Sequence, residues 1–521
     1  MRQFWNNSWT LSITAGILLG LSYPPIPLPF LVFLAFFLIF RIIDLSDSAR
    51  EAAYKVYPAF LIWNIITTYW LVMATIAGGV AAILANAAVM TLPVMFQHKV
   101  QHSKMSGWLI ALLQTAFWLS YEYLHHLWDL AWPWLVVGNA WANVPSLVQY
   151  ISVTGYWGIS FWVILTTALA YQYLQKPRQS TKVALICILL LFPAWSISIS
   201  FLGSETDHEQ THEAVVVQPN FDSYKPNGGF NSAQQANNHL LSLTDSVITE
   251  NTQLIVWPEN AVQNKIFNIE GYRGFSDRTK NRLKNYAQKH DATLITGATF
   301  FEFYRDSIPA LTYKNKRGAY LPFNAALGFY PDKPMEAYRK HNLVPIVERI
   351  PFVHFLNAVD VFGWVNWNQI QGYGKGYHPD QFSVNGTATP ALICYDSVFP
   401  NWILNYVRNG AGYLTIITND GWWGNTSGHE QHFAYARLRA IEFDRWIVRS
   451  ANNGISGIIT PDGSVKVETP YWKTTAFTYD VPVLTSKTLY TRFGDWLPYL
   501  MMALSIVGIG ITFFGKSRNK K

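Results

Sequence analysis

Eight long apolar blocks constrain the fold of this chain more than any other feature of its sequence. Each block is long enough to cross a bilayer as a helix, which takes roughly 17 to 25 residues. Seven of them precede residue 203 and the last lies near the end of the chain; they fall near 8–23, 27–43, 57–75, 77–97, 106–124, 157–174, 183–202 and 496–514. Further blocks follow the first directly, without a small-residue cleavage site, so we expect it to be retained. The pattern predicts a polytopic α-helical membrane domain of about eight spans.

The basic residues predict an orientation for these blocks. If the N-terminus is cytoplasmic, 13 Lys and Arg lie on the cytoplasmic side, and the opposite loops, including the long one from about 125 to 156, contain none. The 13 residues are Arg2, Arg41, Arg50, Lys55, Lys99, Lys104, Lys176, Arg178, Lys182, Lys516, Arg518, Lys520 and Lys521. Such an asymmetry is typical of the positive-inside distribution of membrane proteins. We therefore expect both termini in the cytoplasm and the segment 203–490 on the outer side.

Ionisable residues inside the apolar blocks are few. Glu122, His125 and His126 lie at the outer end of the fifth block, where headgroups or water can solvate them, so we interpret them as an interfacial cap rather than a proton relay. No block carries a run of ionisable residues along one face. This scarcity disfavours a polytopic transporter with an extracytoplasmic cap.

The segment from about 203 to 490 has the composition of a soluble globular domain. Short β-rich runs alternate with amphipathic helical stretches, which predicts an α/β domain with covered sheet faces. The predicted strands are 214–219, 253–257, 292–299, 323–330, 389–394 and 413–418, and the predicted helices are 231–249, 275–290, 398–409 and 428–450. We thus expect a membrane domain over 1–202, an α/β domain over 203–490, and an eighth span with a basic tail over 491–521.

The net charge of +7 does not belong to the α/β segment. Between residues 203 and 515 there are 26 basic and 27 acidic residues, so the positive excess resides in the membrane loops and the C-terminal tail. A neutral domain offers no phosphate-binding patch, and the sequence therefore argues against a nucleic-acid partner.

Three polar residues follow apolar, strand-like runs in the α/β segment. Glu259 comes directly after Pro258, Lys340 follows the run that begins at Ala337, and Cys394 ends the run 389–394. Singly, the two charges would be ordinary surface residues and the cysteine a small buried hydrophobe. Together they supply a base, a cation and a nucleophile, which thiol acyl chemistry requires. The other cysteine, Cys187, lies within an apolar block, so no disulfide framework is expected.

The order of these three residues resembles the Glu-Lys-Cys triad of the nitrilase superfamily. The motif Tyr338-x-Lys340-x-x-Leu-Val-Pro, with Glu348 eight residues beyond the lysine, resembles more narrowly the apolipoprotein N-acyltransferase family. Further agreements are Gln218-Pro219-Asn220, the segment 418–424, and a helix expected to end in 449–454. Two departures are Asp396, where relatives often have Glu, and Gly421-Trp422-Trp423, where Ala-Trp-Phe is common. The shorter Asp396 leaves open how it reaches its partner.

The resemblance implies an α-β-β-α sandwich and an acyl transfer in two steps. Glu259 would act as base, Cys394 would take an acyl chain from a phospholipid as a thioester, and Lys340 with the backbone N–H of Tyr395 would stabilise the oxyanion. Glu348 would hold Lys340, while Tyr395 and Asp396 would shape the pocket. The acceptor would be the N-terminal amine of a diacylglyceryl-modified apolipoprotein. The resemblance further implies a monomer in the bacterial inner membrane, with its catalytic domain in the periplasm and with no cofactor or metal.

Several alternatives stay open. A membrane-anchored nitrilase-type amidase or carbon-nitrogen hydrolase would use water to resolve the same intermediate, and a catalytically inactive domain would serve as a binding module. His429 and His432 have the spacing of paired metal ligands, but no third ligand is suitably placed, so a helix face is favoured. The apolar residues that precede the cysteine either form arms that dip into lipid or pack conventionally; they are Phe352, Phe355, Val361, Phe362 and Trp364.

Overall fold

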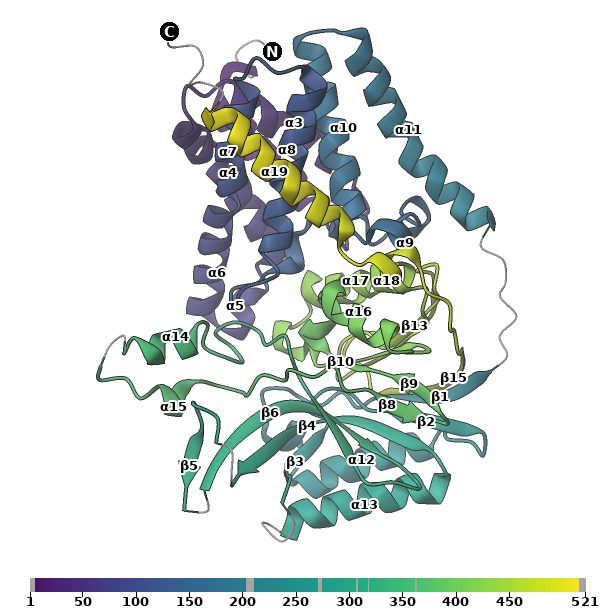
Figure 1. The fold of residues 1–521 in the computed structure, drawn as a ribbon. Coiled ribbons are helices and arrows are strands. Elements are labelled where there is room, and N and C mark those ends of the chain that lie inside the picture. Colours follow the sequence, from purple (N-terminus) through teal and green to yellow (C-terminus); the bar gives the residue numbers. More distant parts are fainter. Residues whose placement is uncertain are drawn as a thin grey trace. The chain divides into compact units, whose positions relative to one another are not determined.

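The computed structural model describes residues 5–202, 210–269, 274–305, 308–316, 318–360 and 363–514 (Figure 1). Its contacts divide the chain into two compact units. The helical unit comprises Met1–Glu205, Thr426–Glu442 and Thr488–Lys521, and the α/β unit comprises Thr206–Asn425 and Phe443–Lys487. The segment 426–442 therefore groups with the apolar helices, although it lies within the range 203–490.

Every predicted apolar block forms helix in the helical unit. The helices are α2 (Ser8–Gly20), α3 (Leu31–Asp44), α4 (Ala49–Thr68), α5 (Leu71–Ala74), α6 (Ile76–Val89), α7 (Thr91–Gln101), α8 (Gly107–Leu124), α9 (Ile151–Thr154), α10 (Trp157–Gln175), α11 (Gln179–Leu202), α17 (Ser427–Phe443), α18 (Leu489–Phe493) and α19 (Trp496–Phe514). In the described part of the chain, Ile76–Gln101 and Gln179–Ile199 are long and apolar enough to cross a membrane, and Ser8–Gly20 and Trp496–Thr512 are shorter apolar helices.

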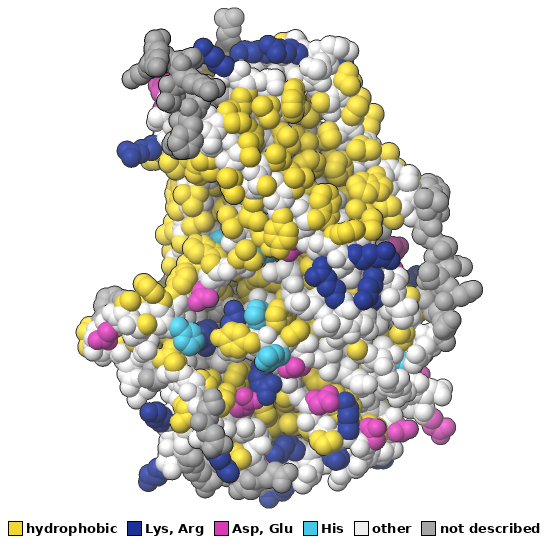
Figure 2. Space-filling model, in the orientation of Figure 1, with side chains coloured by type: hydrophobic (Ala, Val, Ile, Leu, Met, Phe, Trp, Pro, Cys, Tyr) yellow, Lys and Arg dark blue, Asp and Glu magenta, His cyan; other side chains and the backbone are white. Residues whose placement is uncertain are grey.

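The helical unit is apolar inside and outside. Inside, Trp118 packs edge-on against Phe36 with ring centroids 4.8 Å apart, and a Cβ at Gly16 would lie 2.6 Å from the carbonyl oxygen of Ala59, so α2 and α4 meet closely. Outside, large apolar side chains such as Ile13, Leu190 and Ile506 are exposed. On the face shown in Figure 2, hydrophobic side chains cover most of this unit, and Lys and Arg gather at one end of it. An apolar exterior of this extent suits lipid rather than water.

The buried polar groups near the end of α8 have protein partners. Glu122 accepts hydrogen bonds from the Trp118 indole at 2.9 Å and from the Val137 backbone at 2.8 Å. A ring nitrogen of His126 lies 2.5 Å from the Tyr156 hydroxyl, and His125 is also buried. The prediction that headgroups or water solvate this cluster is therefore wrong, because Trp118 of the same helix and the long loop after α8, which folds back, supply the partners.

A buried amide of helix α17 makes four hydrogen bonds within the helical unit. Gln431 Oε1 accepts hydrogen bonds from the indole N–H groups of Trp134 at 2.7 Å and Trp70 at 3.2 Å. Its Nε2 donates to the carbonyl oxygens of Pro24 and Thr67, each at 3.0 Å. His429 and His432 lie on this helix, and both are buried.

The predicted helix over 428–450 is too long. It ends at Phe443, and the next residue, Asp444, has a left-handed φ of +52°. Strand β12 (Ile447–Ala451) then begins, and it is buried throughout and pairs in parallel with β11 (Leu414–Thr418). The expectation that 449–454 ends a helix is therefore also wrong. Burial of Ile447 and Val448, whose branched side chains suit a strand, outweighs the helical periodicity.

The α/β unit contains two larger sheets. The eight-stranded sheet has the order β15-β1-β2-β4-β6-β5, with β3 on β4 and β7 on β6, and the five-stranded sheet has the order β10-β11-β12-β13-β14. Their remaining strands are β1 (Thr211–Gln218), β2 (Thr252–Val256), β3 (Val262–Phe267), β4 (Thr293–Tyr304), β5 (Tyr313–Asn315), β6 (Gly318–Phe329), β7 (Glu336–Arg339), β10 (Ala391–Ile393), β13 (Gly457–Ile459), β14 (Val465–Glu468) and β15 (Thr475–Pro482). All six predicted strands are present, as β1, β2, β4, β6, β10 and β11.

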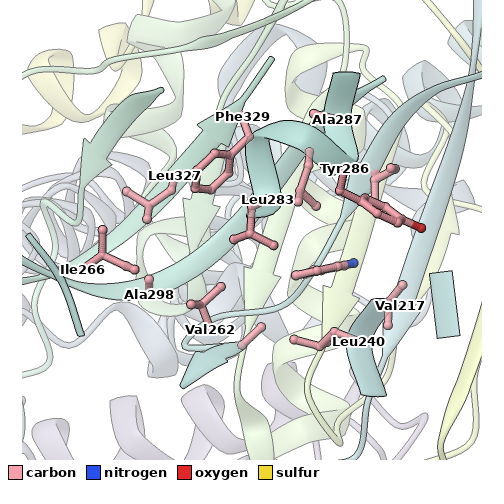
Figure 3. Packing of buried hydrophobic residues seen from close by; sticks show 14 of the residues in the cluster. Val217, Leu240, Val262, Ile266, Leu283, Tyr286, Ala287, Ala298, Leu327 and Phe329 are labelled. Atoms are coloured by element: carbon pink, nitrogen blue, oxygen red, sulfur yellow. The ribbon is translucent and has the colours of Figure 1, made fainter. Parts of the chain in front are cut away.

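Helices α12 (Ala233–Asp245) and α13 (Gly274–His290) cover one face of the larger sheet (Figures 1 and 3). Leu240 and Leu283 of these helices pack with Phe329 and other buried strand residues in one cluster. The two sheets meet through β1 and β12, where the Ser450 hydroxyl donates to the Val217 carbonyl oxygen at 2.7 Å. Helix α16 (Pro400–Arg408) follows β10 in the chain. The predicted helices 231–249, 275–290 and 398–409 are thus confirmed, as is the α/β sandwich.

Candidate active site

The three residues predicted to carry the chemistry each follow a strand of the α/β unit. Glu259 follows β2, Lys340 follows β7 and Cys394 follows β10. Their exposed fractions are 5%, 1% and 9%, respectively. Charged side chains are rarely this buried unless they are paired. Glu259 and Lys340 are therefore not ordinary surface charges.

Lys340 lies between two carboxylates. Its Nζ is 3.5 Å from Glu259 Oε1, 2.9 Å from Glu348 Oε2 and 3.0 Å from Glu348 Oε1. The backbone N–H of Val344 also donates to Glu348 Oε2 at 2.7 Å. Burial by itself would lower the pKa of Lys340, but Glu348 and Glu259 outweigh it and the net pKa is raised. The lysine is a fixed positive charge in this site.

Cys394 occupies a backbone conformation that few non-glycine residues adopt. Its φ is +46°, and it begins a 3₁₀ turn over Cys394–Val398 directly after β10. The Ser397 hydroxyl donates to the Cys394 carbonyl oxygen at 2.7 Å and closes the turn. Left-handed residues of this kind cost about 1 to 3 kcal/mol and cluster at functional sites. The sharp turn from strand to helix presents the thiol at the end of the sheet.

The surroundings of Cys394 favour a neutral thiol. Burial raises its pKa, the charge of Glu259 raises it further, and Lys340 lowers it without reversing the direction. The pKa of Glu259 is also raised, by burial, although Lys340 opposes this. A thiolate is therefore not preformed in the resting site. A base has to remove the proton as the substrate reacts.

We expect the alkylation of Cys394 by iodoacetamide to have its pH midpoint above about 8.5, the value for an unperturbed cysteine. A raised pKa means that the thiolate forms only at higher pH. Slow entry of iodoacetamide into the site lowers the rate at every pH and leaves the pH midpoint unchanged, so the midpoint reports the pKa of the Cys394 thiol. Glu259→Gln removes one charge that raises the pKa and should move the midpoint to lower pH. The rate would be followed by mass spectrometry of the Cys394 peptide. A wild-type midpoint at or below that of free cysteine would mean that Lys340 dominates.

Asp396 connects the cysteine turn to the lysine segment. Its Oδ2 accepts a hydrogen bond from the Tyr338 hydroxyl at 2.8 Å, and its Oδ1 accepts one from the Asn342 backbone at 2.8 Å. These partners lie two residues on either side of Lys340, so a shorter Asp reaches both without difficulty. Burial raises the pKa of Asp396 to about 6. The neighbouring Tyr395 is buried, with its ring edge-on to Phe399 at 5.0 Å.

Two residues that complete the site were not predicted from the sequence. The Asn324 amide donates to Glu259 Oε1 at 2.6 Å and to Glu348 Oε1 at 2.8 Å, and the Asn419 backbone N–H donates to Glu259 Oε2 at 2.9 Å. Asn324 interrupts the otherwise apolar run 321–329, and this polar residue within a predicted strand could have marked it as a candidate site residue. Asn419 acts through its backbone, for which the side-chain sequence gives no direct signal.

The apolar arm that precedes the cysteine is partly described. Phe352 has φ of +55° and precedes the short helix α14 (Val353–Ala358), while Phe355 and Trp364 are exposed, the latter by 85%. Val361 and Phe362 lie outside the described residues. Conventional packing therefore does not account for Phe355 or Trp364.

Comparison with known proteins places this site in a family. The carbon-nitrogen hydrolase model matches residues 216–488, more than half of the sequence, and the chain belongs to that family. A second model, the apolipoprotein N-acyltransferase N-terminal domain, matches residues 15–169. The predicted resemblance to the apolipoprotein N-acyltransferase family is thereby confirmed, since similarity to its members also extends over nearly the whole chain.

Relatives and solved structures give the extent of this similarity. The apolipoprotein N-acyltransferase of Chlorobaculum tepidum is 29% identical over 518 residues, covering 95% of this chain and 94% of that protein. Apolipoprotein N-acyltransferase 2 of Treponema denticola is 27% identical over 430 residues, covering 78% and 77%. The crystal structure of Saccharomyces cerevisiae Nit3, from branch 10 of the nitrilase superfamily, is 16% identical, covers 54% of this chain and 93% of its own, and superposes with a TM-score of 0.39.

Proposed function

We propose that this chain is an N-acyltransferase that completes the maturation of bacterial lipoproteins. The observation that carries the proposal is a buried cysteine beside a carboxylate and lysine pair, in a chain similar over 95% of its length to an apolipoprotein N-acyltransferase. The donor is a membrane phospholipid and the acceptor is the N-terminal amine of a diacylglyceryl-modified apolipoprotein. An apolar helical unit suits a reaction whose two substrates both reside in the bilayer.

In the first step Glu259 accepts the proton of the Cys394 thiol while the sulfur attacks an ester carbonyl of the phospholipid. The tetrahedral oxyanion is stabilised by Lys340 and the backbone N–H of Tyr395. When the intermediate collapses, the C–O bond of the ester breaks and Glu259 returns the proton to the leaving oxygen. The products are a thioester on Cys394 and a lysophospholipid.

In the second step the amine of the apolipoprotein attacks the thioester carbonyl. Glu259 takes a proton from the attacking nitrogen and gives it to the departing sulfur, so that an amide forms, the C–S bond breaks and Cys394 is restored. The sequence of events is a ping-pong mechanism with one covalent intermediate. Glu348 fixes Lys340 throughout, and Tyr395 and Asp396 shape the pocket around the cysteine.

The membrane arrangement is part of the proposal. The domains are a seven-helix membrane domain over 1–202, a catalytic domain over 203–490 and an eighth span with a basic tail over 491–521. The support is the coincidence of all eight apolar blocks with helices and the distribution of Lys and Arg. We infer a monomer in the bacterial inner membrane with its catalytic domain in the periplasm.

The decisive test is mass spectrometry of the purified protein after incubation with phospholipid. We expect an acyl adduct on Cys394 that disappears when a diacylglyceryl-modified peptide is added, with the acyl group recovered on the peptide amine. If the adduct were instead hydrolysed at the same rate with and without the peptide, and no acylated peptide formed, the result would support an amidase or carbon-nitrogen hydrolase. The match to the N-terminal domain of the acyltransferases favours the first outcome.

Labelling of single cysteines with a membrane-impermeant maleimide tests the orientation. In a chain without Cys187 and Cys394, a cysteine replacing exposed Lys314 should react in intact spheroplasts. One replacing exposed Lys104 should react only after lysis, because its loop is expected in the cytoplasm. The reverse pattern would place the catalytic domain in the cytoplasm and refute the lipoprotein function, since the acceptor is presented outside.

A further inference from the structure

Asn324 lies at the centre of the charged site, although it carries no charge. Strand β6 directs Phe323 and Ala325 into the core shared with α12 and α13. Because successive side chains of a strand point to opposite faces, Asn324 points the other way. Its backbone carbonyl oxygen accepts a hydrogen bond from the Lys340 N–H at 2.9 Å, so the two residues are opposite each other at the end of the β6 and β7 pairing.

The charges around Asn324 do not balance. Two carboxylates, Glu259 and Glu348, share the single ammonium of Lys340, and all three groups are largely buried. Lys340 is closer to Glu348, at 2.9 Å, than to Glu259, at 3.5 Å. Asn324 Nδ2 donates one hydrogen bond to Glu259 Oε1 at 2.6 Å and another to Glu348 Oε1 at 2.8 Å. Hydrogen bonds of this kind favour the charged form of a carboxylate.

The orientation of the amide leaves one of its polar atoms unpaired. Only the NH₂ end of an asparagine can face two carboxylates, so Oδ1 must point elsewhere. That oxygen is buried and has no hydrogen-bond partner among the described residues. An unpaired buried acceptor opposes folding. What distinguishes Asn324 is that both of its donated hydrogen bonds go to carboxylates, and hydrogen bonds to charged acceptors are the stronger kind.

We propose that Asn324 is the positioning residue that keeps the Glu259 carboxylate ionised and able to accept the Cys394 proton. This inference deepens the proposed function and rests on its thiol acyl chemistry. Without the amide, Glu259 loses a hydrogen bond that favours its charged form, and it would hold a proton up to a higher pH. The base that receives the Cys394 proton would then be lost over the acidic part of the pH range.

The test is the pH dependence of acyl-adduct formation on Cys394, followed by intact-protein mass spectrometry with p-nitrophenyl butyrate as a simple acyl donor. Asn324→Leu keeps the branched shape and the number of heavy atoms of the side chain and removes both donors. The rate depends on ionised Glu259 and falls at low pH, and loss of a hydrogen bond to this charged group should move the acidic limb up by about 1 to 2 pH units. Asn324→Asp, which adds a third carboxylate, should also move it up.

The matched control is Asn237→Leu. Asn237 is likewise a buried asparagine of the α/β unit, with Nδ2 donating to Asn264 at 2.8 Å and with Oδ1 unpaired within the described chain. The acidic limb of the acylation rate of Asn237→Leu should lie at the wild-type pH, even if the substitution lowers the thermal stability of the protein. An Asn324→Leu profile that superimposes on the wild type, or that falls by one factor at every pH, would overturn the inference. If Asn324→Leu does not fold, Asn324→Asp decides in the same way.

The two acyl donors distinguish a failure of this inference from a failure of the proposed function. If wild-type protein is acylated by p-nitrophenyl butyrate but not by phospholipid, the proposed acyl donor is wrong, while the pH profiles still decide the role of Asn324. If neither donor acylates Cys394, both proposals fail together, because the thiol chemistry on which they rest is absent.

Discussion

Replacing Cys394 by serine is expected to abolish lipoprotein N-acylation. Serine keeps a nucleophilic atom in the same strained turn, but its hydroxyl is a far weaker acid than a thiol, whose ordinary pKa is about 8.5. Glu259 is too weak a base to ionise an alcohol, so acylation of the serine should be very slow. Any ester that formed would be a poorer acyl donor to an amine than a thioester. We expect no product and, at most, a slowly accumulating adduct at position 394, measured by mass spectrometry.

Two further variants frame this result. Cys394→Ala removes the nucleophile and should give neither adduct nor product; in subtilisin, loss of the nucleophilic serine lowers turnover on the order of 10⁶-fold. Cys187→Ala should leave both steps intact, because Cys187 is exposed on α11 and belongs to the helical unit. Normal turnover of Cys394→Ser, or an acyl group carried by Cys187, would show that the triad is assigned wrongly.

The fold was predictable where local pattern and burial agree. The apolar blocks and the six strands were located correctly because each contains a mostly apolar run, although β4 and β6 extend beyond their predicted ranges, to Tyr304 and from Gly318 respectively. The prediction of a helix over 428–450 was wrong at its C-terminal end because the segment is divided between two units. Its first part, to Glu442, belongs to the helical unit, whereas Ile447–Ala451 completes a buried sheet in the other. The helical periodicity of the sequence over 428–450 does not show where the chain passes from the helical unit into the sheet.

The candidate site was predictable only in part. Strand ends identified Glu259, Lys340 and Cys394 as polar residues after apolar runs. What they do to one another depends on distances between strands of two sheets, and no single sequence window contains these. The hydrogen bonds from Asn324 and from the Asn419 backbone arise across such distances. The question left open by the shorter Asp396 is answered by geometry as well, because its partners Tyr338 and Asn342 come to the cysteine turn.

Lys340→Arg should lower acyl transfer by about 10²- to 10³-fold or more, although it conserves the charge. The guanidinium is planar and donates in fixed directions, so beside Glu348 it should form a forked pair and aim no N–H at the developing oxyanion. Lys340 is 1% exposed, so the longer side chain has no solvent into which to turn. The loss should appear in the rate of adduct formation on Cys394, while the thermal unfolding midpoint shows whether the variant is folded.

Lys280→Arg is the matched control for this substitution. Lys280 is also a lysine of the α/β unit that is mostly shielded from solvent, and its Nζ lies 3.0 Å from Asp277 and donates to the Phe267 carbonyl oxygen at 3.2 Å. It touches none of the reacting groups, so Lys280→Arg should acylate Cys394 at the wild-type rate. If Lys340→Arg did the same, a positive charge alone would satisfy the site. The ammonium would then be a structural partner of Glu348, and the oxyanion would depend on backbone N–H groups such as that of Tyr395.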